Sequence, residues 1–123
     1  MTVYAIDYSG STDHALAARA AKQIAAKGSV DDVAITFDNR IAGVASAPQA
    51  ESLINNAGGG GTSVQNVLDW ANNRGHKTVT IYTDGYFHEA SLNTYDLLVT
   101  VILMGEDDKV NQRMSLPVVG RLR

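Results

Sequence analysis

Short apolar runs that end in polar turns alternate along this chain with segments whose apolar residues recur at helical spacing. Such runs, rich in β-branched residues, predict strands that are buried in a sheet. The predicted strands are Thr2 to Ile6, Val33 to Asp38, Ile41 to Ala45, Thr78 to Thr83 and Leu97 to Met104, with Pro117 to Leu122 as a candidate last edge strand. Because strands and helices alternate, we expect an α/β fold with a mostly parallel sheet.

Two features of these runs predict where strands lie in the sheet. Asn39 and Arg40 separate two short runs by only two residues, which is typical of an antiparallel hairpin at an edge. The run from Leu97 to Met104 is almost wholly apolar, which is typical of a strand covered on both faces. We therefore place it in the centre of the sheet beside Thr78 to Thr83.

Three segments are predicted to be helices. They are Thr12 to Lys27, Pro48 to about Asn56, and a segment that Thr62 or Ser63 caps and that ends between Asn73 and Gly75. Gly28 follows the first helix, where glycine commonly ends a helix. The residues expected to face the sheet are Leu16, Ala17, Ala20, Ala21 and Ile24 in the first helix and Val64, Val67, Leu68 and Ala71 in the third. The alanine stripe predicts that the first helix lies close to the sheet.

The composition predicts one globular domain that spans residues 1–123. With 123 residues and 45% hydrophobic content, the chain can bury one core but is too short for two ordinary domains. Cysteine is absent, which excludes disulfides, thiolate metal sites and thiol nucleophiles and fits a reducing compartment. The first residues lack a basic leader, and no run approaches the roughly 20 apolar residues of a membrane span. We therefore expect a cytoplasmic protein with no membrane partner.

The charge balance gives no electrostatic footprint for nucleic acid. Ten basic and thirteen acidic residues leave a formal net charge of −3, with a sequence pI of about 5.4. The basic residues are scattered except for Arg121 and Arg123, and the acidic run from Glu106 to Asp108 is interpreted as a solvated loop. Because phosphate backbones are bound by clustered Lys and Arg, nucleic acid is a poor candidate partner.

Oxygen-bearing side chains gather at the predicted ends of two central strands. The first strand runs directly into Asp7-Tyr8-Ser9-Gly10-Ser11, and a later strand runs into Asp84. Thr62 follows a run of four glycines that we interpret as a shaped loop. Binding sites of parallel sheets lie beyond the carboxyl ends of the strands, so these residues are expected at one edge.

This donor set suits a small, hard cation. Asp7 and Asp84 offer carboxylates, while Ser9, Ser11 and Thr62 offer hydroxyls. Mg²⁺ prefers about six oxygen ligands and readily keeps waters among them. The sequence therefore predicts a Mg²⁺ or Mn²⁺ site, with Ca²⁺ less favoured.

The three motifs, in this order, resemble the metal-ion-dependent adhesion site of von Willebrand factor A domains. They are Asp7-Tyr8-Ser9-Gly10-Ser11, the Gly-Gly-Thr loop that ends at Thr62, and Thr83-Asp84-Gly85. The resemblance extends over nearly the whole chain. It implies a three-layer, Rossmann-like sandwich with strand order 3-2-1-4-5, a candidate sixth strand, an antiparallel edge hairpin and helices on both faces.

The resemblance also implies a role for each residue of the site. Ser9, Ser11 and often Thr62 would bind the metal directly, whereas Asp7 and Asp84 would act mostly through water. One coordination position would stay open for an Asp or Glu of a partner protein, which implies a binding module rather than an enzyme. The residues beside the site that are candidates for partner contact are Tyr8, Gly61, Ser63, Tyr86 and Phe87.

The run of four glycines before Thr62 is similar to a bacterial and phage subgroup of this family. Members of that subgroup sit beside a metallopeptidase-like segment or work with an AAA-type ATPase, so such an ATPase or a host protein is a candidate partner. This chain is shorter than the usual family member, with little room for the helices that ordinarily follow the second aspartate. The chain therefore has little room for the surface that the family builds there.

Two other functions stay open at this point. Asp7 at the end of a first strand is also how aspartyl-phosphate enzymes begin, which would make the chain a Mg²⁺-dependent phosphoryl-transfer enzyme. Ser9 argues against this, because such enzymes resemble Asp-x-Asp and use the second aspartate as general acid or base. The chain could instead be a scaffold or inhibitor that binds its target without metal.

Simpler interpretations exist for single residues. Ser9, Ser11 and Thr62 are each ordinary helix caps, and Tyr86 and Phe87 could simply cover the end of the sheet. The glycine run lacks the lysine of a phosphate-binding loop. The three histidines, His14, His76 and His88, are too far apart in sequence for a zinc motif and are expected to be exposed.

Overall fold

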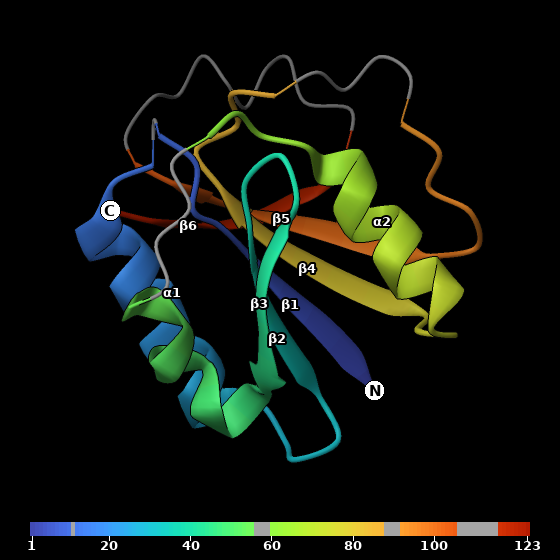
Figure 1. Ribbon diagram of the computed structural model, residues 1–123, viewed down its shortest axis with the longest axis horizontal. Helices are drawn as coiled ribbons and strands as arrows, with labels where there is room; N and C mark the ends of the chain where they lie inside the picture. The colour runs from blue at the N-terminus through green and yellow to red at the C-terminus, as the bar shows by residue number, and fades with distance from the viewer. Residues whose placement is uncertain (11, 56–59, 88–91, 106–115) are drawn as a thin grey trace.

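The chain forms a six-stranded, mostly parallel sheet with helices packed against it (Figure 1). The computed structural model describes residues 1–10, 12–55, 60–87, 92–105 and 116–123. The strands are β1 (Thr2–Asp7), β2 (Val33–Phe37), β3 (Ile41–Ser46), β4 (Thr78–Thr83), β5 (Leu98–Met104) and β6 (Val118–Leu122). They lie in the order β3-β2-β1-β4-β5-β6, and only β3 is antiparallel to its neighbour. The predicted α/β class is confirmed, and the arrangement is broadly that of a Rossmann-like fold.

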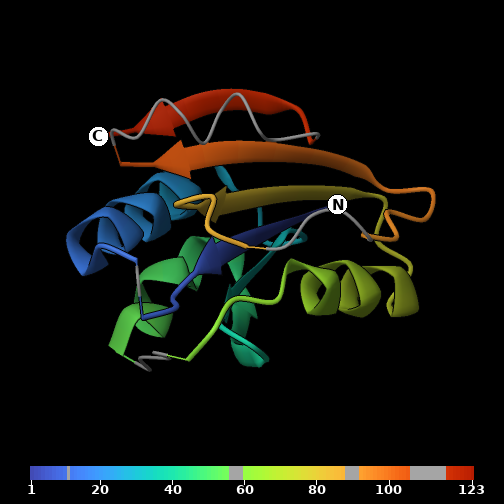
Figure 2. The same ribbon diagram turned by 90° about the horizontal axis from the view of Figure 1, so that it is seen from above.

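Side chains alternate along the strands, so each face of the sheet has its own core. Helix α2 (Val64–Asn73) packs on one face, where Val67 and Leu68 share a buried core with Val3, Ile81 and Val101. Helix α1 (His14–Lys27) and the 3₁₀ segment η1 (Ala47–Asn55) pack on the other face (Figure 2). None of the helices in the described part of the chain is long and apolar enough to cross a membrane.

Helix α1 lies close to its neighbours because its buried stripe is almost all alanine. Ala17, Ala20, Ala21 and Ile24 are fully buried, as predicted. The helix begins at His14 rather than Thr12, because the Asp13 carboxylate accepts hydrogen bonds from two backbone N–H groups of the first turn. Gly28 ends the helix with φ near −77°, so its role is space rather than a left-handed turn. A Cβ on Gly28 would lie 2.4 Å from the Cβ of Ala47 in η1.

The edge hairpin β2–β3 is confirmed, and the helix predicted after it is a 3₁₀ segment. A register shift between Thr36 and Phe37 accommodates the turn, and Gly43 pairs with Thr36. A Cβ at Gly43 would meet Thr36 Oγ1 at 3.0 Å, so this pair packs tightly. The Thr36 hydroxyl is buried and has no hydrogen-bond partner within the described residues. A buried hydroxyl without a partner costs about 1–3 kcal/mol.

Thr36→Val is therefore expected to raise the free energy of unfolding by about 1 kcal/mol, because it replaces the unpaired hydroxyl with a methyl of similar size. Urea denaturation of both proteins measures the change. Thr36→Ser keeps the hydroxyl but removes the methyl, and should lower stability. If Val lowers stability as much as Ser does, the Thr36 hydroxyl makes a hydrogen bond in the folded protein.

The end of α2 holds a histidine that the sequence wrongly predicted to be exposed. His76 is 8% exposed and stacks on Trp70, with ring centroids 5.7 Å apart. Its Nδ1 atom is buried and has no partner within the described residues. Burial lowers the pKa of His76, and the positive charge of Arg74 lowers that pKa further. The folded protein therefore favours the neutral imidazole. His14 is exposed as predicted, and His88 lies outside the described residues.

A lowered pKa for His76 predicts that stability depends on pH. The stability that neutral His76 contributes to the folded protein is fully present above the unfolded pKa of about 6.5. It is lost as pH falls through the lower folded pKa. Unfolding free energies measured from neutral pH down to pH about 5 should fall in the wild type and fall less in His76→Phe, which cannot take up the proton. Equal slopes for the wild type and His76→Phe would contradict the assignment.

Strand β5 departs from its prediction on one face. It lies between β4 and β6, inside the sheet, and Val99, Val101 and Leu103 are buried on the α2 side. On the opposite face Leu98 is 65% exposed and Ile102 is only half-buried. The apolar run was therefore wrongly taken to mean full cover on both faces. The predicted edge strand is confirmed as β6, while the acidic run 106–108 lies outside the described residues.

Candidate metal centre

The ends of β1 and β4 bring the two predicted aspartates to one edge of the sheet. The strands are parallel neighbours, and Ile6 lies opposite Tyr82. Asp7 comes one residue after Ile6 and Asp84 two residues after Tyr82, so both lie at the same end of the sheet. Burial raises the pKa of the Asp7 carboxyl, and the negative charge of Asp84 adds to that rise. Two carboxylates therefore lie within electrostatic reach of each other at the carboxyl end of the sheet.

Asp7 is fully buried and is held by two donors. The Thr83 hydroxyl donates to one carboxylate oxygen at 2.7 Å, and the Ser9 backbone N–H donates to the other at 3.0 Å. Burial raises the pKa of Asp7, hydrogen bonds from Thr83 and Ser9 lower it, and the net direction is upward. No cationic side chain in the described part of the chain is among the groups that shift it. A buried carboxylate beside a second carboxylate is stabilised when a cation is bound between them.

The turn after β1 carries the predicted serines. Ser9 is buried, and its hydroxyl lies 3.2 Å from the Thr12 hydroxyl. The Thr12 N–H donates to the Ser9 carbonyl and so closes the turn at 3.1 Å. Ser11, the other predicted hydroxyl ligand, lies outside the described residues.

Tyr8 connects this turn to η1 and β2 through hydrogen bonds. It is 3% exposed, its hydroxyl donates to the Ile54 carbonyl at 2.8 Å, and its ring stacks on His14. Its N–H donates to the Phe37 carbonyl at 2.7 Å, which extends the pairing of β1 with β2. Tyr8 was predicted as a candidate partner contact. Its buried position gives it a role in fixing the turn to η1 and β2.

The loop that leads to Thr62 is tied to the same turn. The Gly10 N–H donates to the Gly60 carbonyl at 3.1 Å. Thr62 follows two residues later and is half-buried, while Gly61 is exposed. Ser63 caps α2 by accepting from the Asn66 N–H at 3.4 Å, so of the two caps that the sequence allowed the structure uses Ser63. That leaves the Thr62 hydroxyl outside the capping interaction.

A residue that the sequence analysis missed, Asp38, anchors this loop. Its carboxylate accepts from the Gly60 N–H at 3.3 Å and from the Arg40 N–H at 3.1 Å. Its backbone carbonyl accepts from the Ser63 N–H at 2.8 Å. Asp38 follows an apolar strand just as Asp7 and Asp84 do, and that placement could have identified it. Asp38 therefore binds residues on both sides of Thr62 in this loop.

Thr83 is a second residue that the sequence analysis did not assign to the site. Its hydroxyl donates to Asp7 and accepts from the Gly85 N–H at 3.1 Å, so it joins the ends of β1 and β4. Its position directly before Asp84 was the available signal. The Asp84 carboxylate accepts from the Tyr86 N–H at 3.1 Å, and Gly85 takes a left-handed φ of 88°. This tight turn fixes the Asp84 side chain.

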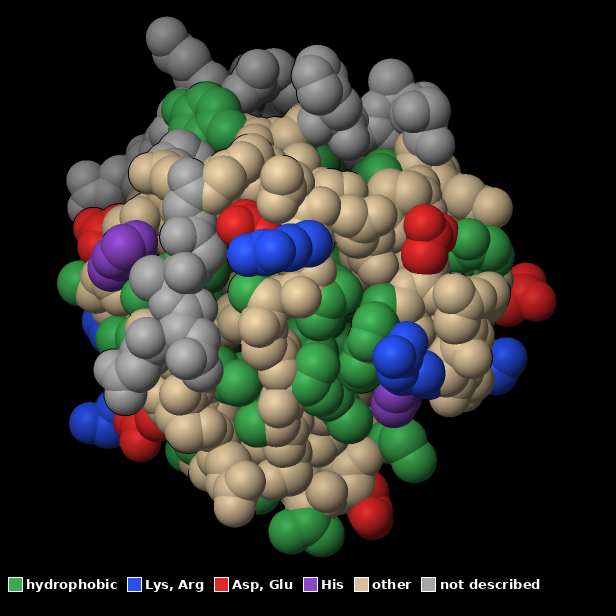
Figure 3. Space-filling model, viewed as in Figure 1, with side chains coloured by type: hydrophobic (Ala, Val, Ile, Leu, Met, Phe, Trp, Pro, Cys, Tyr) green, Lys and Arg blue, Asp and Glu red, His purple; other side chains and the backbone are tan. Residues whose placement is uncertain are grey.

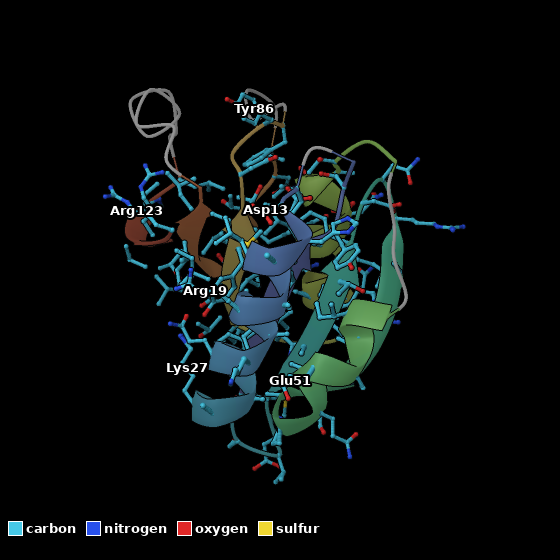
Figure 4. All side chains as sticks on the ribbon, turned by 90° about the vertical axis from the view of Figure 1, so that its left-hand side faces the viewer. Asp13, Arg19, Lys27, Glu51, Tyr86 and Arg123 are labelled. Atoms are coloured by element: carbon cyan, nitrogen blue, oxygen red, sulfur yellow. The ribbon has the colours of Figure 1, made fainter. Side chains whose placement is uncertain are left out.

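Tyr86 and Phe87 take different positions after this turn. Tyr86 is 51% exposed and lies at the same end of the molecule as Asp13, which caps the start of α1 (Figure 4). Phe87 is half-buried against the core on the α2 side. Of the pair, Tyr86 presents a large side chain beside the candidate site, and Phe87 covers the sheet end.

The donors brought together at this edge are carboxylate and hydroxyl oxygens. Among the residues that the structure describes, no three His, Asp or Glu side chains group as metal ligands would. A metal here would therefore depend on hydroxyl oxygens beside the two carboxylates. That chemistry fits Mg²⁺ or Mn²⁺, which bind hard oxygen ligands and keep waters. Compared with known proteins, the chain matches no family model, and no curated protein is significantly similar to it.

Thr83→Val tests the link between the two strand ends. Loss of the hydroxyl leaves a buried carboxylate oxygen without its donor, so the free energy of unfolding should fall by about 1.5–3 kcal/mol in metal-free buffer. Thr80→Val on the same strand is the matched control. Its hydroxyl is half-buried and, among the described residues, pairs with that of Thr100 at 3.3 Å, so its loss should cost under about 1 kcal/mol. Equal losses in urea denaturation would show that Asp7 does not depend on Thr83.

Proposed function

We propose that this protein is a metal-dependent protein-binding module of the von Willebrand factor A type, which uses a Mg²⁺ site to capture an acidic side chain of a partner. The proposed architecture is a single, minimal domain with three layers and strand order 3-2-1-4-5-6, and the proposed site lies at the carboxyl edge of its sheet. The partner is another protein, with an AAA-type ATPase or a host protein as candidates.

One observation carries the proposal. Asp7 is fully buried beside the charge of Asp84, and the hydrogen bonds from Thr83 and Ser9 leave its pKa raised. Burying an uncompensated carboxylate costs several kcal/mol, and a hydrogen bond to a charged group contributes about 1.5–3 kcal/mol. A divalent cation at this edge would stabilise both carboxylates together.

The proposed ligands are the five residues of the predicted site. Ser9, Ser11 and Thr62 would bind the metal directly, and Asp7 and Asp84 would bind it largely through water. With few negative charges in direct contact, the metal would attract an incoming carboxylate strongly in this partly desolvated setting. The partner's Asp or Glu would fill the position that the chain leaves open.

The surface around the site supports recognition of a protein. Tyr86 is half exposed beside Asp84, and aromatic side chains next to a site commonly anchor a partner. Gly61 and Ser63 lie on the loop that carries Thr62 and complete the proposed contact, with Tyr8 and Phe87 behind them. Basic side chains are scattered among acidic ones on the face seen in Figure 3, which favours a protein over a nucleic acid.

Calorimetric titration with MgCl₂ tests the site. The wild type should bind one ion, and its melting temperature should rise in Mg²⁺ and fall back in EDTA, because a ligand that binds only the folded state stabilises it. Ser9→Ala and Asp84→Asn should each weaken Mg²⁺ binding at least about tenfold, which is 1.4 kcal/mol. Asp31→Asn, at an exposed aspartate at the opposite end of the sheet, is the matched control and should bind like the wild type.

Two results would contradict the proposal. If MgCl₂ produces no heat of binding and leaves the melting temperature unchanged, the protein does not have this metal site. Mg²⁺-dependent hydrolysis of p-nitrophenyl phosphate that disappears in Asp7→Asn would instead make the protein a phosphoryl-transfer enzyme. Partner capture that depends on Mg²⁺ and is lost in Ser9→Ala, but not in Asp31→Asn, is the expected outcome.

A further inference from the structure

The face of the sheet that carries α1 is left partly open over β5 and β6. Figure 4 looks onto this face and shows α1 and η1 in front of one part of the sheet, with β5 and β6 beside α1 and no described helix in front of them. Leu98 is 65% exposed, and Thr100 and Ile102, the next residues of β5 on this face, are half-buried. We call these three residues, with Gly120 of β6, the β5–β6 face.

This face is apolar and carries few groups that need water. Gly120 lies beside Ile102, where an added Cβ would be 3.8 Å from the Ile102 side chain, so the surface there is flat. The hydroxyls of Thr80 and Thr100 lie 3.3 Å apart and share one hydrogen bond. Each oxygen therefore keeps one hydrogen-bond partner when the face is covered, and burial of Leu98 and Ile102 by a partner would be favourable.

Within the described elements around the β5–β6 face the charged residues are basic, although the acidic Asp13 and Asp96 stand next to α1 and β5 in the sequence. Helix α1 and strands β4, β5 and β6 contain no Asp or Glu, although the whole chain has a net charge of −3. Their charged residues are Arg19, Lys22, Lys27 and Arg121. This separation differs from the mixed charges of the face in Figure 3.

Two of these basic residues lie on the flank of α1 that borders the face. The Arg19 guanidinium donates to the Arg123 carbonyl at the end of β6. The Lys27 ammonium lies 5.4 Å from the centre of the Tyr4 ring and 5.8 Å from that of the Tyr82 ring, both on the sheet. Figure 4 shows Arg19 and Lys27 extending on this side of the helix. A partner on the face would meet these positive charges along one side.

We propose that the β5–β6 face is a second interaction surface, which docks an amphipathic, acidic helix of a partner protein. Two strand spacings of about 4.8 Å separate β4 from β6, and this width of roughly 10 Å matches the diameter of one helix. The apolar stripe of the partner helix lies on Leu98 and Ile102, and its Asp or Glu residues face Arg19 and Lys27. A second copy of this chain fits less well, because it would bring like charges together.

The test uses a synthetic helical peptide of about 18 residues, or five turns, with Leu at helical spacing and Glu on both flanks. A matched peptide carries Lys in place of Glu. Fluorescence anisotropy with the full chain should show binding of the Glu peptide that weakens as salt rises, and no comparable binding of the Lys peptide. Binding should be the same in Mg²⁺ and in EDTA, which separates this surface from the metal site.

Substitutions locate the peptide on the protein. Leu98→Asp changes an exposed side chain, and Lys27→Glu reverses a charge at the border. Each should lower the affinity for the Glu peptide at least about tenfold. Lys22→Glu makes the same charge change on the same helix, about 140° around the axis from Lys27, and should leave affinity within about twofold. Circular dichroism and melting temperature check that each variant is folded.

Four results would overturn the inference. They are absence of Glu-peptide binding, equal weakening by Lys22→Glu and Lys27→Glu, amide shift changes in NMR spectra confined to the outer edge of β6, and self-association that Leu98→Asp abolishes. The second result indicates unspecific attraction between charges, the third indicates strand addition at β6, and the fourth indicates a second copy of this chain. Shift changes at Leu98, Thr100, Ile102 and Gly120 are the expected result.

Discussion

The burial of the Asp7 carboxylate is the constraint on which the carboxyl edge of this protein depends. A charge placed where no water reaches it must be stabilised by donors, and here the Thr83 hydroxyl and the Ser9 N–H supply them. These two hydrogen bonds fix the end of β4 against β1 and shape the turn that follows β1. Burial, helped by the neighbouring Asp84, raises the pKa of Asp7 in spite of these donors, which favours the proposed cation site at this edge.

The same principle, an aspartate just after an apolar strand, recurs at β2. Asp38 is almost fully buried and uses its carboxylate and its carbonyl to hold the loop of Gly60 and Ser63. Gly10 then joins that loop to the turn after β1. Three strand ends are thus connected by hydrogen bonds between residues far apart in sequence. This network ties the loop that carries Thr62 to the turn that carries Ser9.

The two faces of the sheet differ in how completely helices cover them. The alanine stripe of α1 and the close contact of Gly28 with Ala47 let α1 and η1 pack tightly together over part of one face. Part of β5 stays open beside α1, at Leu98 and Ile102, on the side of the helix that carries Arg19 and Lys27. The oxygen-rich carboxyl edge and this apolar surface therefore lie at different places on the molecule. Two partners, or two parts of one partner, could bind without competing.

The sequence by itself determined the elements, because their signals are local. Apolar periodicity gave the strands and helices, Asn39 and Arg40 indicated the hairpin, and the polar residues after β1 and β4 indicated Asp7 and Asp84. Only the tertiary structure decided which groups donate hydrogen bonds to the carboxylates at the strand ends. The Thr83 hydroxyl donates to Asp7, which lies 76 positions away in the sequence, and the Asp38 carboxylate accepts from Gly60, which lies 22 positions away. The open face of β5 depends on where α1 lies. A hydrogen bond between distant residues leaves no periodic trace, and the cover of a strand depends on its neighbours rather than on its own composition.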